Sequence, residues 1–135
     1  MSILTCGCGC SCQGNDGPKL IFSCSGCADV GELADQSARK LNRDGAGKMF
    51  CLAGIGGRVS SILKITETAQ SILAIDGCPL DCTKKTLEQA GIMRINHLRL
   101  SDLGYEKGKT EVSSASIAQV IDKVLNTSAD SGIST

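Results

Sequence analysis

Residues 71–82 read SILAIDGCPLDC, an apolar run that stops at an aspartate and leads into two cysteines. The apolar part is unbroken from Ile72 to Ile75, as expected of a strand covered on both faces of a sheet. Asp81 is a good N-cap for a helix that begins at the next residue and ends at Gly91. This stretch therefore predicts a central strand, a tight turn and a helix, with thiols placed at the turn.

The same alternation of strand and helix repeats along the chain. Strands are predicted at residues 20–22, 48–55, 71–77 and 96–104, and helices at 29–45, near 60–63, at 82–91 and at 113–126. Four such repeats indicate an α/β fold with a mainly parallel, doubly wound sheet and helices on both faces. Placing the two most apolar strands in the middle gives the flavodoxin-like order 2-1-3-4. The switch point, where such sheets bind ligands, then lies between the first and third strands.

The length of 135 residues is that of one ordinary domain. Residues 1–17 are rich in glycine and cysteine without a hydrophobic period, which predicts a flexible arm. The α/β domain is expected at residues 18–127. The small polar residues 128–135 are expected to form a disordered tail.

Composition argues against several classes of partner. The 14 basic and 14 acidic residues balance, and there are three aromatic residues, so no nucleic-acid partner is expected. No apolar run approaches the ~20 residues that cross a bilayer, and the N-terminus has no export signal, so no membrane partner is expected either. We therefore expect a cytoplasmic protein with reduced thiols, a setting in which cysteine clusters indicate metal binding or catalysis more often than disulfides. A protein partner is not identified by the sequence.

Four of the nine cysteines follow the two central strands: Cys24 and Cys27 the first, Cys78 and Cys82 the third. In the predicted strand order these pairs meet at the switch point from adjacent loops. Two short-spaced thiol pairs are what a tetrahedral zinc site needs, so the pattern predicts a metal ion as ligand and zinc as the cofactor. Both pairs also lie at helix starts, where the helix dipole favours the thiolate form and lowers the pKa of cysteine.

Other residues near the predicted site are given supporting or open roles. Asp76 is expected to orient the loop by accepting hydrogen bonds from backbone N–H groups. Cys51 is either a fifth thiol near the site or a core residue between Phe50 and Leu52, and the first interpretation is favoured. Crowded thiolates repel one another without a cation, so in the metal-free protein we expect either some of these thiols to be protonated or their loops to be mobile.

Two alternatives to a metal site stay open at this point. The cysteines could be small buried apolar residues, which is common for single free cysteines. The chain could instead be a thiol-based redox or sulfur-transfer enzyme, in which Cys78 or Cys82 at the helix start acts as the nucleophile. His97, the one histidine, has no acidic partner in its own motif and is expected to be a surface residue.

Three segments of the sequence, CSGCADVG, CLAGIGG and IDGCPLDCTKKTLEQAG, resemble the DGC-domain family, named for the Asp-Gly-Cys at residues 76–78. The resemblance runs from about Lys19 to Asn126. It implies a small domain of prokaryotic type that chelates zinc through cysteines. The motif positions are matched by Cys24, Cys27, Cys78 and Cys82, and Cys51 matches a further cysteine-bearing segment. The resemblance supports metal binding or handling and leaves a catalytic activity open.

The motif CGCGCSC at residues 6–12 lies outside this resemblance. Alternating cysteines separated by glycine or serine can wrap a thiophilic ion. The sequence therefore predicts a secondary metal-binding arm formed by Cys6, Cys8, Cys10 and Cys12. An alternative is a low-complexity segment whose thiols have no specific role.

Overall fold

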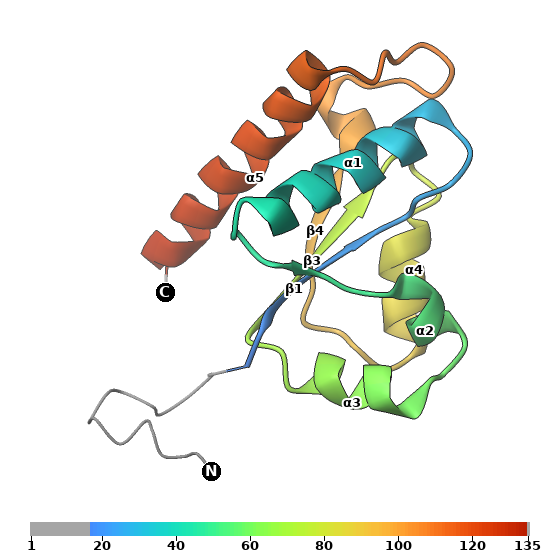
Figure 1. The fold of residues 1–135 in the computed structure, drawn as a ribbon, viewed down its shortest axis with the longest axis vertical. Coiled ribbons are helices and arrows are strands. Elements are labelled where there is room, and N and C mark those ends of the chain that lie inside the picture. The colour runs from blue at the N-terminus through green and yellow to red at the C-terminus, as the bar shows by residue number, and fades with distance from the viewer. Residues whose placement is uncertain (1–16, 135) are drawn as a thin grey trace.

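The structure, a computed structural model, describes residues 17–134, and a parallel sheet lies at the centre of the fold (Figure 1). Its strands are β1 (Lys19–Ser23), β2 (Lys48–Met49), β3 (Ser71–Asp76) and β4 (Asn96–Arg99). The strand order is β2-β1-β3-β4, and all three neighbouring pairs are parallel. The predicted α/β class and the predicted strand order are both confirmed.

Five α-helices connect and cover the described strands. They are α1 (Asp29–Arg43), α2 (Leu52–Gly56), α3 (Ser60–Glu67), α4 (Cys82–Gln89) and α5 (Ser114–Ser134), and a short 3-10 helix spans Leu100–Leu103. Figure 1 shows α1 and α5 together on one face of the sheet, with α2 and α4 on the opposite side. The helices therefore cover both faces, as a doubly wound sheet requires.

The alternation of side chains along β1 divides the core into two layers. Ile21 packs with Leu33 and Ala38 of α1, whereas Phe22 packs with Ile55 of α2 on the other face. All five side chains are buried. Burial on both faces explains why the central strands are apolar throughout.

The second strand is shorter than the sequence predicts. The apolar run at residues 48–55 suggests one strand, but only Lys48 and Met49 pair with β1, and residues 52–56 form α2. Short apolar runs do not by themselves distinguish a strand from a buried helix. Packing favours the helix, because Gly54 lies so close to Ile62 that a Cβ on it would be 2.2 Å from the Ile62 Cδ1 atom.

The ends of two other elements also differ from the sequence prediction. β4 ends at Arg99, and α5 continues to Ser134 instead of stopping near residue 126. None of the helices in residues 17–134 is both long and apolar enough to cross a membrane. The four cysteines of the predicted metal-binding arm, Cys6 to Cys12, lie outside the described residues, and the division into arm, domain and tail stays a prediction.

Candidate functional site

Cys24 joins the two central strands at their carboxyl ends. It directly follows β1, and its backbone N–H donates to the Ile75 carbonyl of β3 at 3.2 Å. Its Sγ atom accepts a hydrogen bond from the backbone N–H of Gly77, at 3.4 Å. The loops after β1 and β3 are thus held side by side at the switch point, where the sequence predicts the site.

The loop after β3 is also pressed against the start of α1. Gly77 is buried, and a Cβ on it would lie 2.7 Å from the backbone carbonyl carbon of Val30. Such a distance is well inside van der Waals contact, so a side chain at this position would push the loop away from α1. The glycine of the Asp-Gly-Cys motif therefore fixes the height of Cys78 above the sheet.

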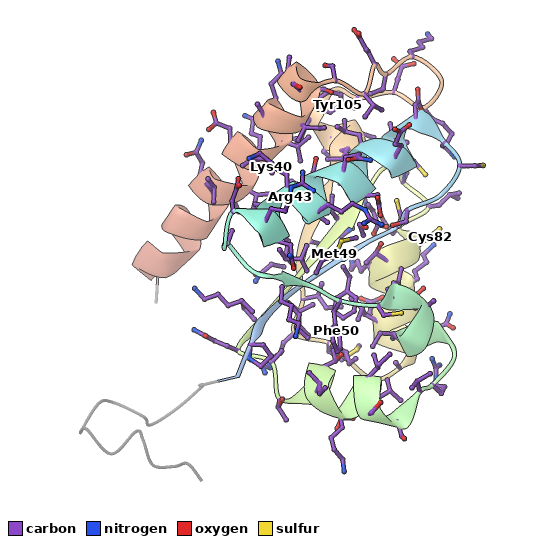
Figure 2. All side chains as sticks on the ribbon, in the orientation of Figure 1. Lys40, Arg43, Met49, Phe50, Cys82 and Tyr105 are labelled. Atoms are coloured by element: carbon purple, nitrogen blue, oxygen red, sulfur yellow. The ribbon has the colours of Figure 1, made fainter. Side chains whose placement is uncertain are left out.

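The other three predicted ligands differ in burial. Cys82 is the first residue of α4 and is exposed, and its charge is one of those that act on the Cys24 thiol (Figure 2). Cys78 is half-buried in the turn before α4. Cys27 is exposed, two residues before α1 begins. The structure places both loops at one edge of the sheet.

Cys51 does not lie on a strand as predicted. It is the N-cap of α2, and its Sγ accepts a hydrogen bond from the Gly54 N–H at 3.3 Å. It is exposed, which also removes the alternative of a core residue between Phe50 and Leu52. Cys51 and Cys24 line the same open hollow, of about 560 Å³, so Cys51 is a neighbour of the predicted site.

The electrostatics of Cys24 differ from the helix-dipole expectation. Burial raises the pKa of the Cys24 thiol above its ordinary value of 9.0, and the negative charges of Asp76 and Cys82 raise it further. Hydrogen bonds from the Gly77 and Gly26 N–H groups oppose this rise. The predicted lowering of the pKa is therefore wrong for Cys24.

The sulfurs of the five cysteines in the described part of the chain do not form a closed shell. Within residues 17–134, one group of three or more possible ligands has all its donor atoms within 4.8 Å of each other, and it consists of Asp76, Asp81 and His97. A tetrahedral zinc–thiolate shell needs sulfurs about 3.8 Å apart, from Zn–S bonds of about 2.3 Å. Closing such a shell around Cys24 would therefore require some of the cysteine-bearing loops to rearrange.

Asp76 holds the start of α4. It is 1% exposed, and its two carboxylate oxygens accept hydrogen bonds from the N–H groups of Thr83, at 2.7 Å, and Lys84, at 3.1 Å. These are among the N–H groups that a helix leaves without partners in its first turn. The predicted role of Asp76, bonding to backbone N–H groups, is confirmed. The expected cap, Asp81, occupies the N-cap position but makes no cap hydrogen bond.

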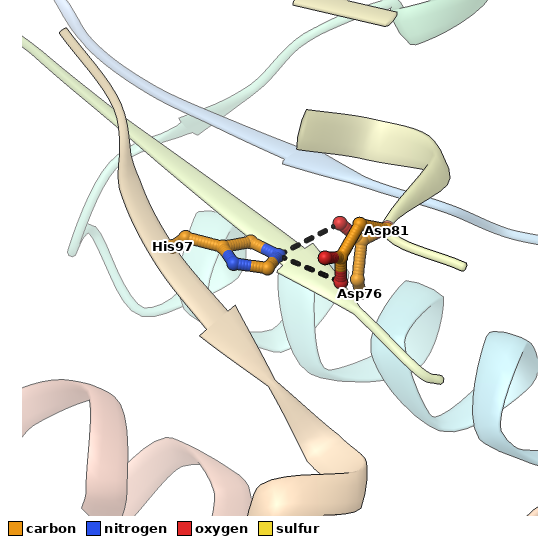
Figure 3. Close-up of side chains that lie close together, drawn as sticks. All are labelled: Asp76, Asp81 and His97. Atoms are coloured by element: carbon orange, nitrogen blue, oxygen red, sulfur yellow. Dashed lines mark hydrogen bonds and ion pairs between the residues drawn. The ribbon is translucent and has the colours of Figure 1, made fainter. Parts of the chain in front are cut away.

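His97 is not the isolated surface residue that the sequence predicts. Its Nε2 atom lies 2.9 Å from Oδ2 of Asp76 and 3.6 Å from Oδ1 of Asp81 (Figure 3). Arg99, two residues further along β4, holds the Asp81 carboxylate through two hydrogen bonds of 2.8 and 2.6 Å. These contacts keep the pKa of Asp81 below its ordinary value of 3.8, chiefly through Arg99.

A signal for this cluster was present in the sequence. His97 and Arg99 are two residues apart on β4, so their side chains lie on the same face of the sheet. The register pairs Ala74 with His97 and Asp76 with Arg99, which brings both side chains toward the Asp76 loop. Reading each motif on its own missed this cross-strand relation.

The Asp76–Asp81–His97 cluster is better described as a structural network than as a second metal site. Each carboxylate oxygen of Asp76 and Asp81 already accepts at least one hydrogen bond from the protein. A cation at this place would have to displace the bidentate Arg99, which already neutralises Asp81. The network instead positions the α4 start, where Cys82 lies.

Comparison with known proteins agrees with the resemblance seen in the sequence. A family model described as the DGC domain matches residues 20–124. The chain belongs to the DGC-domain family. It is also 39% identical, over 93 residues, to the anaerobic and virulence modulator AnvM of Pseudomonas aeruginosa, a match that covers 69% of this chain and 71% of AnvM. No solved structure matches the chain.

The family match defines which cysteines belong to the shared domain. All five cysteines of the described residues fall inside residues 20–124, whereas the CGCGCSC motif lies before them. The two groups of thiols can therefore be treated separately in experiments.

Proposed function

We propose that this DGC-domain protein binds a thiophilic metal ion, zinc in the first place, at the carboxyl edge of its sheet. Cys24, Cys27, Cys78 and Cys82 would supply the thiolates, with Cys51 next to them. The role that follows is metal binding or handling. The observation that carries the proposal is the convergence of Cys24 with the β3–α4 loop, through its two hydrogen bonds to Ile75 and Gly77.

The chemistry of the donors fits this class of metal. Thiolates suit zinc and copper(I), whereas magnesium and calcium prefer oxygen ligands. Cys24 and Cys51 each accept a backbone N–H hydrogen bond at sulfur, an outer-shell contact of the kind that stabilises a metal-bound thiolate. A cation would also offset the Asp76 charge that now disfavours the Cys24 thiolate.

The exposure of the remaining thiols suits a site that exchanges its metal. Cys27 and Cys82 are exposed, so a metal ion or its carrier can reach both thiols from solvent. A structural zinc site is normally closed and preformed with the fold. We therefore favour a metal that is taken up and released over one that holds the fold together.

A thiol enzyme is the second candidate. Cys82 favours it, because this exposed thiol opens an eight-residue helix and has Cys24 as a neighbour that could resolve a mixed disulfide. The AnvM relative is named as a modulator, a description that names no catalysed reaction. The two candidates differ in whether the thiols bind added zinc or stay reactive toward an alkylating reagent.

The test uses the full chain with Cys6, Cys8, Cys10 and Cys12 changed to serine, so that only the folded domain can contribute thiolates. The protein is purified without oxygen, stripped with a chelator and dialysed against zinc. We expect one zinc per chain and about four thiols protected from alkylation, with protection lost when the metal is removed.

Single substitutions then assign the ligands. Cys24→Ser and Cys82→Ser are expected to weaken zinc binding by more than about a hundredfold, since loss of a ligand costs more than the 10- to 100-fold of an outer-shell change. Ser60→Ala, at the exposed start of α3, is the control and should bind as the parent does. A protein that takes up no zinc and has one rapidly alkylated thiol would overturn the proposal in favour of the thiol enzyme.

A further inference from the structure

Two adjoining hollows lie between α1 and the β2–α2 segment, beside the proposed metal site. They measure about 460 and 560 Å³ and share Arg39, Met49, Phe50 and Cys51. Arg43, labelled at the end of α1 in Figure 2, lines the smaller hollow together with Met49 and Phe50. Each volume falls in the range that holds a small ligand.

Two arginines and one aspartate line this double hollow and give it a net positive charge of one. Arg39 and Arg43 lie one turn apart on α1, and both line it. The carboxylate of Asp35 is already bonded, through Oδ2 to the Arg39 Nε atom and through Oδ1 to the Ser25 hydroxyl, both at 2.7 Å. Within the described residues, Arg43 makes no ion pair, and Arg39 uses only its Nε atom in the hydrogen bond to Asp35. The hollow therefore offers guanidinium donors to an anion.

Two thiols line the hollow as well. Cys24 and Cys51 both line it, and Cys51 is exposed there. A ligand that fills the hollow would therefore have a negative group at the arginines and a soft, sulfur-seeking centre at the cysteines. A metal ion carried by small anionic thiolates has both properties.

We propose that this hollow is the entry site for an anionic metal–thiolate complex, which Arg39 and Arg43 bind while Cys24 and Cys51 take the metal. The inference rests on the proposed metal-binding function. In each exchange, one sulfur–metal bond to the protein forms, one sulfur–metal bond to the donor breaks, and the protein thiol proton goes to the departing thiolate. No electron is transferred, so no oxidant is needed.

The same chemistry has two possible sources. One is a free thiol carboxylate of glutathione type, and the other is the CGCGCSC motif of this chain. Cys6 precedes Gly17 by enough chain to extend over more than about 30 Å, at ~3.3 Å per residue. The extended chain from Gly17 along β1 to Ser23 is about 20 Å long. Chain length therefore allows either source, and the experiment separates them.

The experiment measures how fast the metal-free full chain takes zinc from a preformed zinc–glutathione complex and from zinc acetate. The Arg39→Gln, Arg43→Gln double variant is expected to accept zinc from the glutathione complex about tenfold more slowly, a gap that narrows at high salt. Uptake from zinc acetate should be unchanged by the arginine substitutions when Cys6, Cys8, Cys10 and Cys12 are also serine, because no thiolate complex then delivers the metal. The matched control, Arg94→Gln with Lys123→Gln, removes the same charge from exposed positions outside the hollow.

Changing Cys6, Cys8, Cys10 and Cys12 to serine identifies the source. If the free complex is the donor, this variant takes zinc from glutathione as fast as the parent. If the arm is the donor, the parent shows a transfer phase independent of protein concentration, which the serine variant loses and the arginine variant slows. Equal rates for the arginine variant and its control, from every source, would overturn this inference. Failure to bind zinc at equilibrium would instead overturn the proposed function.

Discussion

At the scale of single residues, Asp76 has the most constrained position in the site. It ends β3, is buried, and accepts hydrogen bonds from two N–H groups of α4 and from His97. Three partners on one carboxylate connect β3, α4 and β4. The residue that gives the family motif its first letter thus acts as a structural link next to the cysteines.

Replacing Asp76 should cost far more stability than replacing a surface aspartate nearby. We expect Asp76→Ala to lower the free energy of unfolding by about 2–4 kcal/mol, since a helix cap is lost and buried N–H groups are left without acceptors. Asp102→Ala is the control, because the Asp102 side chain is 65% exposed. Urea titration measures both, and a loss below about 0.5 kcal/mol for Asp76→Ala would show that the cap is dispensable.

Asp81 predicts a pH dependence. Its folded pKa lies below the ordinary value of 3.8, so its stabilising contribution is present above that value and is lost as the pH falls through the folded pKa. Asp81→Asn keeps a residue that tolerates the left-handed backbone at φ 54°, but it removes the charge that Arg99 binds.

We therefore expect the stability gap between the parent and Asp81→Asn to shrink as the pH is lowered from about 5 to about 2.5. Urea midpoints across this range are the measurement, with Asp122→Asn, an exposed aspartate of α5, for comparison. A gap that stays constant with pH would mean that the charge of Asp81 does not matter.

At the scale of elements, α2 shows how a short apolar run can mislead. The sequence Phe50-Cys51-Leu52 looks like the middle of a strand, yet the chain leaves the sheet at Met49. The turn into α2 depends on Gly54, which packs against Ile62 of α3. A pattern of a few residues does not contain the contacts between α2 and α3, so the sequence alone predicts a strand position for Cys51.

Substitutions of Cys51 test whether its sulfur caps the N-terminus of α2. We expect Cys51→Ala to lower the free energy of unfolding by about 1 kcal/mol, because the N-cap acceptor for Gly54 is lost. Cys51→Ser should retain the stability, since serine is a preferred N-cap residue. Thermal or urea unfolding compares the two, and equal losses in both variants would argue against a capping role for the sulfur.

At the scale of the whole molecule, the sequence predicts the architecture well and the site in part. Unbroken apolar strands, helical stripes and their alternation suffice for the strand order, which places the loops after β1 and β3 side by side. Loop depth, burial and cross-strand partners do not follow from order alone. The raised pKa of Cys24 and the link from His97 to Asp76 therefore emerge only when the chain is folded.

The central claim is that the metal is held by thiolates and not by the oxygen and nitrogen atoms of Asp76, Asp81 and His97. X-ray absorption at the zinc edge distinguishes these donor sets directly, because Zn–S bonds are about 2.3 Å long whereas Zn–N and Zn–O bonds are about 2.0–2.2 Å. The sample is the zinc-loaded chain whose CGCGCSC cysteines are serines. Our account predicts a shell of three or four sulfurs at about 2.3 Å. A shell made only of nitrogen and oxygen, at the shorter distance, would contradict it.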